Sequence, residues 1–286
     1  MNVEGTEKLT VHRNGVVQIA QADCLDFLRN VSDESVGLVL TDPPYNIGFD
    51  AGAGWDSQWA TEKEYLEWCR EWTLECVRTL SPGRMFIVWG TLKTDTFLKY
   101  KLDVLNSIPS MVRQNEIVWS YNWGGRTKTN FARKHEYAWC YSKGESFLFN
   151  ADDVRVERKM RTNMRTGHEH VKGTIPTSVW ERNNHTMSKD FCGWHPTTKN
   201  VEVLERMVRA YTCEGDTVLD IFSGSGSTAV AAVRAGRNMV GCEKNPDYHR
   251  RSLARIAELA PNTKIVNPTV DTPKISSSVC ENDEAQ

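Results

Sequence analysis

The sequence predicts an α/β fold in which helices cover both faces of a largely parallel sheet. Short apolar runs typical of strands alternate along the chain with segments whose apolar residues recur at helical spacing. Two of these runs, VGLVL and RMFIVWG, are apolar throughout, as expected for strands buried on both faces. At 286 residues, the chain is long enough for one large domain or for one domain with an insertion.

The predicted elements of the first half begin near Val16, after a polar arm over residues 1–15. VVQIAQAD predicts a strand, CLDFLRNV a short helix, and VGLVLTDPPY a buried strand with its exit loop. TEKEYLEWCREWTLECVRTL predicts a long helix, with Thr61 as its N-cap and Pro82-Gly83 as its stop. We then expect a strand over RMFIVWG, a helix over TLKTDTFLKYKLDVLNSI, and a pair of strands over NEIVWSYN and HEYAWCYSKG.

The second half begins with a break in this alternation. From about Phe149 to Gly193, charged and polar residues dominate, which indicates an insertion or a loop that orders on binding. HPTTKNVEVLERMVRAYT then predicts a helix, and DTVLDIFSGSGSTAVAAVRAG a strand, a glycine loop and a helix. NMVGCEKN predicts a strand and DYHRRSLARIAEL a helix, and residues 261–286 have the composition of a disordered tail.

Composition excludes several classes of protein. The formal net charge is only -2, so a surface for nucleic acid would require uneven placement of charge. The eight cysteines form no C-x-x-C pair, which argues against a zinc ribbon or a disulfide framework, and His168 and His170 have no further ligand-like spacing. From this Cys and His spacing, we expect no metal. The sequence has no apolar signal core and no membrane-length apolar run, so we expect a cytoplasmic protein.

The stretch TDPPYNIG, residues 41–48, directly follows a predicted buried strand. Pro43 and Pro44 fix their own φ angles and have no N–H donor, so the chain leaves the strand as a stiff loop whose carbonyls can accept hydrogen bonds. An isolated Asp-Pro pair usually marks a turn. The four-residue string Asp-Pro-Pro-Tyr would occur by chance on the order of once in a thousand chains of this length, which favours a functional role.

A second motif, DIFSGSGSTA, lies between a predicted strand and a helix. Gly224, Gly226 and Ala229 fit the pattern G-x-G-x-x-[GA], and Glu243 ends the next strand. Glycines let the backbone approach a ligand, a helix N-terminus favours negative charge, and the carboxylate can accept two ribose hydroxyls. Several nucleoside cofactors fit this description, NAD among them, and so does a purely structural tight turn.

The two motifs together resemble a known family. DPPY at 42–45 and FSGSG at 222–226 are similar to the signature motifs of S-adenosylmethionine-dependent DNA methyltransferases that modify adenine N6 or cytosine N4. The catalytic motif precedes the cofactor motif, which resembles the β class of these enzymes. HPTTK at 195–199 is similar to the family's His-Pro-Thr-x-Lys segment, although Asn200 stands where a proline is common, and HEYAWCYSKG resembles the strand after the catalytic half.

The resemblance covers roughly residues 17–258 and implies a fold and an organisation. The fold would be the Rossmann-like seven-stranded methyltransferase sheet, permuted in sequence, with an inserted target-recognition region. The expected divisions are a flexible arm at 1–15, a catalytic half at 16–124, a DNA-contact region at 125–190, a cofactor half at 191–260 and a disordered tail at 261–286.

The resemblance assigns catalysis to Asp42, Pro43, Pro44 and Tyr45. An exocyclic amine is a poor nucleophile because its lone pair is delocalised into the ring, so two acceptors that hold its hydrogens assist in-line attack on a methyl group. The Asp42 carboxylate and the Pro43 carbonyl suit this task, while Tyr45 can stack on a base flipped out of the duplex. Because cytosine-N4 enzymes of the family usually carry Ser at the first position, Asp42 favours adenine.

The implied cofactor, S-adenosyl-L-methionine, would contact residues from three segments. Asp23 is a candidate acceptor for its adenine amine and Glu243 for its ribose hydroxyls, while Lys199 could pair with its carboxylate, although a solvated lysine fits that position too. The full set of expected cofactor contacts is Asp23, Cys24, His195, Thr197, Lys199, Asp220, Phe222, Gly224, Gly226 and Glu243.

The resemblance implies DNA as the partner, and residues 126–134, which carry four cations and no acid, could contact its phosphates and base edges. These candidate DNA-binding residues are Arg126, Lys128, Arg133 and Lys134, although a solvated basic surface would look the same. Cytosine-N4 methylation is the main alternative activity. RNA adenine methylation, NAD-dependent dehydrogenation and non-catalytic nucleic-acid binding are more remote, and a homodimer and a companion restriction enzyme are left open.

Overall fold

A computed structural model of the chain describes residues 15–48, 54–122, 127–157, 173–182 and 190–266. The strands are β1 (Val16–Gln21), β2 (Val36–Thr41), β3 (Leu80–Gly90), β4 (Met111–Ser120), β5 (His135–Lys143), β6 (Val179–Glu181), β7 (Thr217–Asp220), β8 (Asn238–Glu243) and β9 (Lys264–Val266). The α-helices are α1 (Cys24–Leu28), α2 (Glu62–Thr79), α3 (Asp95–Lys99), α4 (Val201–Tyr211), α5 (Ser227–Arg234) and α6 (Pro246–Leu259). Three short turns of other helix types are η1 (Tyr100–Val104), η2 (Leu105–Ser107) and η3 (Asp152–Val154).

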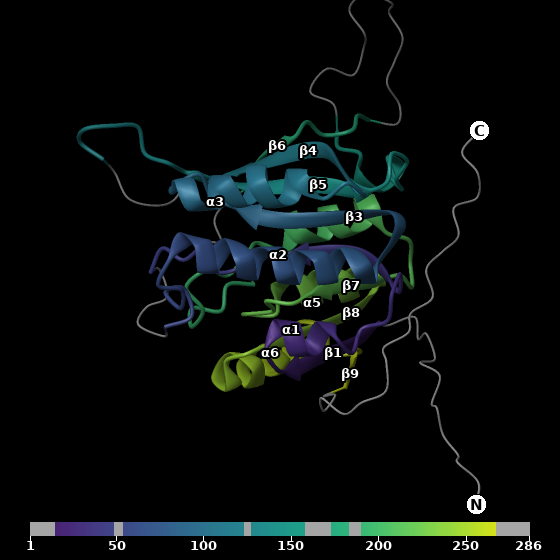
Figure 1. The fold of residues 1–286 in the computed structure, drawn as a ribbon. Helices are drawn as coiled ribbons and strands as arrows, with labels where there is room; N and C mark the ends of the chain where they lie inside the picture. Colours follow the sequence, from purple (N-terminus) through teal and green to yellow (C-terminus); the bar gives the residue numbers. More distant parts are fainter. Residues whose placement is uncertain (1–14, 49–53, 123–126, 158–172, 183–189, 267–286) are drawn as a thin grey trace, which may run out of the picture.

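All nine strands form one sheet in the order β6-β4-β5-β3-β2-β7-β8-β1-β9 (Figure 1). The strands from β3 to β9 in this order are parallel, whereas β5 is antiparallel to both β3 and β4. The short strands β6 and β9 lie at the two edges, and the other seven form the centre. The predicted α/β fold with a seven-stranded methyltransferase sheet is confirmed, with one short strand added at each edge.

The two halves of the chain meet where β2 pairs with β7. Leu38 lies opposite Val218 and Val39 opposite Leu219, although about 180 residues separate the two strands. Because parallel strands end at the same edge of a sheet, the residues that follow β2 and β7 are neighbours. The DPPY loop and the glycine loop therefore leave the sheet side by side.

Helices bury both faces of this sheet, as the apolar strands predict. Leu38 and Leu40 face one core, which contains residues of α4, α5 and α6, while Val39 faces a second core with residues of α1, α2 and α3. The second core is rich in aromatic rings, with Trp72 packed on Phe86 at a centroid distance of 6.4 Å. This alternation fixes the register of β2, since a shift by one residue would exchange its two faces.

The long predicted helix is α2, and its N-cap is confirmed, because the Thr61 hydroxyl accepts a hydrogen bond from the Glu64 N–H at 3.2 Å. Its expected stop is corrected. The helix ends at Thr79, before the proline, and Pro82 and Gly83 lie inside β3. Gly83 has a φ of 71°, and the pairing of β2 with β3 shifts in register nearby, so the two residues mark an irregular start of the strand.

Two other segments differ from the predicted elements. The helix expected after β3 is divided into α3, a π-helical turn and a 3₁₀ turn. Within the expected tail, residues 264–266 form β9, which pairs in parallel with β1. In this strand, Ile265 pairs with Val17 and Val266 with Gln18. The arm before Gly15 and the tail after Val266 lie outside the described residues.

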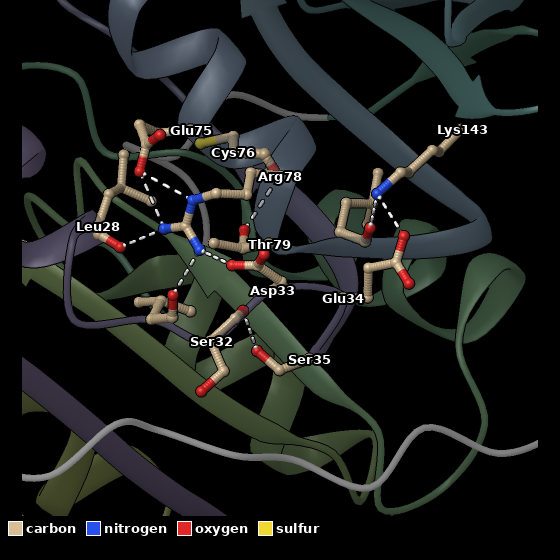
Figure 2. A network of polar contacts seen from close by, with 12 residues as sticks. Leu28, Ser32, Asp33, Glu34, Ser35, Glu75, Cys76, Arg78, Thr79 and Lys143 are labelled. Carbon is tan, nitrogen blue, oxygen red and sulfur yellow. Dashed lines mark hydrogen bonds and ion pairs between the residues drawn. The ribbon is translucent and has the colours of Figure 1, made fainter.

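Arg78 connects the C-terminal end of α2 to the segment between α1 and β2 (Figure 2). Its guanidinium donates to the carbonyls of Leu28 and Val31, at 2.7 and 2.9 Å. It also forms ion pairs with Asp33 at 2.5 Å and with Glu75 at 2.9 Å. These contacts use the planar fork of an arginine and would not be reproduced by lysine.

We expect Arg78→Ala to lower the free energy of unfolding by about 2 kcal/mol, because two carbonyls and two carboxylates lose a charged donor. Arg29→Ala is the matched control, since Arg29 makes an exposed pair with Asp26 and should cost less than about 0.5 kcal/mol. Urea denaturation of the wild type and both variants measures the difference. Equal effects of the two substitutions would contradict the structural role of Arg78.

Candidate active site

The DPPY loop is held by contacts at both of its ends. The Tyr45 hydroxyl donates to Asp42 Oδ1 at 2.6 Å, and the ring of Tyr45 packs on Phe97 at a centroid distance of 4.6 Å. The Tyr65 hydroxyl, from α2, donates to the Pro44 carbonyl at 2.8 Å. Asp42 and the two prolines therefore have fixed orientations, and the expected stacking of Tyr45 on a base stays a prediction.

Lys199 reaches the same carboxylate from the segment before α4. Its ammonium donates to Asp42 Oδ2 and lies 3.2 Å from Glu136 Oε2, and its side chain is 9% exposed. Burial alone would lower the pKa of Lys199, but the charges of Asp42 and Glu136 raise it, so the ammonium stays charged. An ammonium has three N–H donors, so the expected contact with a cofactor carboxylate remains compatible with this arrangement and stays a prediction.

A hydrogen bond connects the DPPY loop to the glycine loop. The Thr41 hydroxyl, at the end of β2, donates to Asp220 Oδ1 at 2.8 Å, and the Phe222 N–H donates to the same oxygen at 3.1 Å. Burial raises the pKa of Asp220 to about 6, while the hydrogen bonds from Thr228 and Thr41 act in the opposite direction. Asp220 therefore orients the start of the glycine loop and fixes it to the strand that carries Asp42.

The glycine loop has the backbone that the motif predicts. Gly224 and Gly226 have φ angles of 47° and 76°, in the left-handed region that favours glycine. The Glu243 carboxylate accepts from the N–H groups of Gly224 and Asn245, each at 2.8 Å. Glu243 therefore lies at the glycine loop, as expected, although contact with a ribose stays a prediction.

His195 covers the glycine loop. A Cβ atom at Gly224 would lie only 2.8 Å from His195 Nε2, so a side chain there would displace the histidine. The His195 ring also packs near Tyr248 and Trp55, at centroid distances of 4.7 and 6.4 Å. The Thr197 N–H donates to His195 Nδ1 at 3.4 Å, which places both predicted residues in one cluster.

Asn200 stands where a proline is common in the family, and it starts α4 in a different way. Its side-chain oxygen accepts from the Val203 N–H at 3.2 Å and caps α4. Proline would start the helix through its fixed φ, whereas asparagine does so by satisfying an N–H group.

Asp23 and Cys24 lie at the opposite side of β8 from the DPPY loop. Asp23 caps α1 by accepting from the Leu25 N–H at 3.0 Å and forms an ion pair with Lys244 at 3.2 Å. Gln21 pairs with Glu243, so Asp23 follows the strand next to the ribose candidate. Burial raises the pKa of the Cys24 thiol to about 12, which leaves it unreactive. Their contact with a cofactor adenine stays a prediction.

The predicted DNA-binding residues lie between β4 and β5. Lys128 and Arg133 are exposed; Arg133 donates to the Leu92 carbonyl at 3.0 Å, and Lys134 to the Asn122 carbonyl at 3.1 Å. Arg126 lies outside the described residues, as do His168 and His170. Phe131 lies within the same basic segment and is 95% exposed.

Asp56 is a residue of the site that the sequence analysis missed. Its carboxylate accepts from the N–H groups of Tyr45, Asn46 and Ile47, at 2.6, 2.7 and 3.2 Å, and the residue is 2% exposed. Asn46 has a φ of 55°, so these three donors converge on one buried anion. Distance along the sequence from the DPPY motif did not point to Asp56, because Asp50 is closer to the motif.

In the part of the chain that the structure describes, no group of three His, Cys, Asp or Glu side chains could hold a metal ion. None of the described helices is long and apolar enough to cross a membrane.

The fold and this pair of loops together are those of a Rossmann-like methyltransferase. The profile of the N6_N4_Mtase family, described as DNA methylase, matches residues 36–255. The chain therefore belongs to this family of DNA methylases, whose methyl donor is S-adenosyl-L-methionine. The glycine backbone and the buried acceptor Glu243 fit such a nucleoside cofactor, as the geometry above shows.

Individual relatives agree with this assignment. The chain is 31% identical to the type II methyltransferase M.HpaI of Haemophilus parainfluenzae over 239 residues, 82% of this chain and 72% of that protein. It is also 31% identical to the DNA adenine methyltransferase YhdJ of Escherichia coli over 256 residues, 85% of this chain and 83% of that protein.

Solved structures show the same fold at low sequence identity. The PvuII DNA methyltransferase, cytosine-N4-specific, matches with a TM-score of 0.66 and 18% identity over 90% of this chain and 96% of that chain. The M1.HpyAVI–SAM complex matches with a TM-score of 0.58 and 21% identity over 84% of this chain and 99% of that chain.

We expect Asp56→Ala to slow methyl transfer and to lower the free energy of unfolding by about 3 kcal/mol, because three partly buried N–H groups lose their acceptor. Asp56→Asn keeps one oxygen acceptor and should be milder in both measurements. Methyl incorporation into DNA and urea denaturation check these outcomes, with the exposed Asp26→Asn as control. Full activity of Asp56→Ala would show that the carboxylate does not position the loop.

Proposed function

We propose that this DNA methylase transfers a methyl group from S-adenosyl-L-methionine to adenine N6. The observation that carries the proposal is the connection of Asp42 to the glycine loop through Thr41 and Asp220. In this proposal, Asp42 is the acceptor for the target amine, and the neighbouring glycine loop holds the nucleoside cofactor. A dehydrogenase would use the glycine loop but would have no role for the DPPY loop.

The chain's own residues would act by positioning and by electrostatics. S-adenosyl-L-methionine supplies an electrophilic methyl group when bound. Asp42 would accept one hydrogen of the target amine and the Pro43 carbonyl the other, so that the nitrogen lone pair points at the methyl group. Asp42 would also stabilise the positive charge that develops on the nitrogen. Tyr45 would stack on the flipped base.

The proposed cofactor contacts occupy the end of the sheet from β2 to β1. Glu243 would accept the ribose hydroxyls, Asp23 the adenine amine, and Lys199 would face the carboxylate. His195 and Thr197 would bound the methionine end, since His195 lies over Gly224 and Thr197 donates to His195. Lys128 and Arg133, on the segment that precedes β5, would contact DNA phosphates.

Two observations favour adenine over cytosine. Cytosine-N4 enzymes of the family usually carry Ser where this chain has Asp42, and the relative from Escherichia coli is named a DNA adenine methyltransferase. Cytosine N4 is the second candidate, supported by the likeness in fold to the PvuII enzyme. Both substrates present an exocyclic amine to the same acceptors, so the product must be identified directly.

We expect Asp42→Asn to reduce methyl transfer about a hundredfold to a thousandfold, because the side chain keeps its shape but loses the charge that stabilises the nitrogen. Asp42→Ala should abolish transfer while cofactor binding is largely retained. Tritiated methyl incorporation into unmethylated duplex DNA, followed by nucleoside analysis, measures both rate and product. The control is Asp103→Asn, an exposed position away from the loop.

Full activity of Asp42→Ala would refute the role of this carboxylate. N4-methylcytosine as the wild-type product would refute the choice of base and leave the class of enzyme intact.

We expect Glu243→Gln to weaken binding of S-adenosyl-L-methionine by roughly 1 to 3 kcal/mol, since a charged acceptor at the glycine loop becomes neutral. Calorimetric titration measures this change, with the exposed Glu258→Gln on α6 as control. Titration with NAD in parallel tests the cofactor itself. Unchanged affinity in Glu243→Gln would remove this residue from the cofactor site, and preferential binding of NAD would refute the cofactor.

A further inference from the structure

Glu136 brings a second carboxylate to the DPPY loop, and the proposed methyl transfer does not use this carboxylate. It lies near the start of β5, and its Oε2 atom is buried, 3.2 Å from Lys199 Nζ. The same ammonium donates to Asp42 Oδ2. One cation is thus shared by two carboxylates, one from the loop after β2 and one from β5.

The sum of these charges matters for the proposed reaction. With both acids ionised, Asp42, Glu136 and Lys199 carry a net charge of one negative unit. Asp42 and Lys199 alone would form a neutral pair, in which the carboxylate is neutralised and makes a weak proton acceptor. The additional negative charge from Glu136 lets the group accept one proton and become neutral.

A proton must be accepted if an amine is methylated. The nitrogen lone pair forms the N–C bond while the C–S bond breaks and leaves its electron pair on sulfur. The nitrogen then has a positive charge and still bears both hydrogens. One of them must leave as a proton to give the neutral methylamino product.

We infer that Glu136 is a positioning residue, which holds the Lys199 ammonium so that the Asp42 carboxylate is available to receive this proton. The inference rests on the proposed methylation of an amine. Lys199 keeps a charged partner in Glu136 when Asp42 receives the proton, and Asp42 releases the proton to solvent after the product leaves. Loss of Glu136 would leave Asp42 as the sole acid for a buried cation.

The other groups around Asp42 agree with this assignment. Burial raises the pKa of Asp42, the Lys199 charge lowers it, and the Glu136 charge raises it again. Burial raises the pKa of Tyr121 to about 12, so this hydroxyl near Glu136 and Lys199 stays neutral. The charged or titratable groups that face this cluster come from several elements: Tyr45 from the loop, Tyr121 after β4, Glu136 on β5, Lys199 before α4 and Asp220 at the end of β7.

The test compares Glu136→Gln with Glu116→Gln, a matched control on β4 whose carboxylate pairs with Lys101 instead. Single-turnover methyl transfer to DNA is measured from acidic to neutral pH. We expect Glu136→Gln to lower the maximal rate about tenfold or more with little change in the affinity for cofactor or DNA. The acidic limb of its pH profile should move down by about half a unit to one unit, because a nearby negative charge no longer raises the pKa of Asp42. Glu136→Asp keeps the charge and should restore the limb and part of the rate.

The inference would be overturned if Glu136→Gln had an unchanged rate, or a reduced rate with an unmoved acidic limb. It would also be overturned if the control Glu116→Gln behaved like Glu136→Gln. If Glu136→Gln does not fold by circular dichroism, Glu136→Asp decides alone, because a wild-type rate and profile in this shortened side chain would refute positioning by Glu136. A wild-type protein that transfers no methyl group to DNA amines would instead refute the proposed function. The two failures are therefore distinguishable.

Discussion

The pairing of β2 with β7 is the constraint on which the rest of the site depends. It joins halves of the chain that are far apart in sequence, and the hydrogen bond from Thr41 to Asp220 fixes the alignment at the edge where both strands end. Each strand contributes a loop that has little function alone. A glycine loop can hold a nucleoside, and an acid followed by two prolines can hold an amine. A transfer reaction requires the two loops to lie at a fixed distance from each other. The sheet supplies this separation through its fixed strand spacing.

The DPPY loop separates the hydrogen bonds of its backbone from those of its Asp42 carboxylate. Its prolines remove two N–H groups that would otherwise compete for the Asp42 carboxylate, and Asp56 accepts the next three N–H groups along the chain. The polar backbone of the loop is thus satisfied by a different acid. Asp42 is left to the side chains of Tyr45 and Lys199, which can exchange partners without rearranging the backbone.

Local patterns were sufficient for the α/β class and for most of the strands and helices, whereas the seven-stranded sheet was implied by the resemblance of two motifs to a family. The roles of the site residues stay predictions. Apolar runs located the central strands, and Thr61 marked the start of α2 by a contact within one turn. The errors have non-local causes. Pro82 and Gly83 lie inside β3 because Leu80 before them and Met85 after them both pair with β2, and β9 forms because β1 has an open edge. Asp56 and Glu136 were missed for the same reason. Each acts through a contact between segments, and nothing in the spacing of acids along the chain distinguishes them from solvated ones.

The position of β1 in the sheet has a consequence for synthesis on the ribosome. This strand, the first of the described strands in sequence, lies between β8 and β9, which belong to the last part of the described chain (Figure 1). At typical elongation rates of 5–20 residues per second, about 10 to 50 s separate the synthesis of β1 from that of its partners. During this interval, Val17 and Ile19, which are fully buried in the finished protein, have no strand to pair with. A nascent chain of this protein therefore exposes the apolar strand β1, a segment suited to chaperone binding, until β8 and β9 have been made.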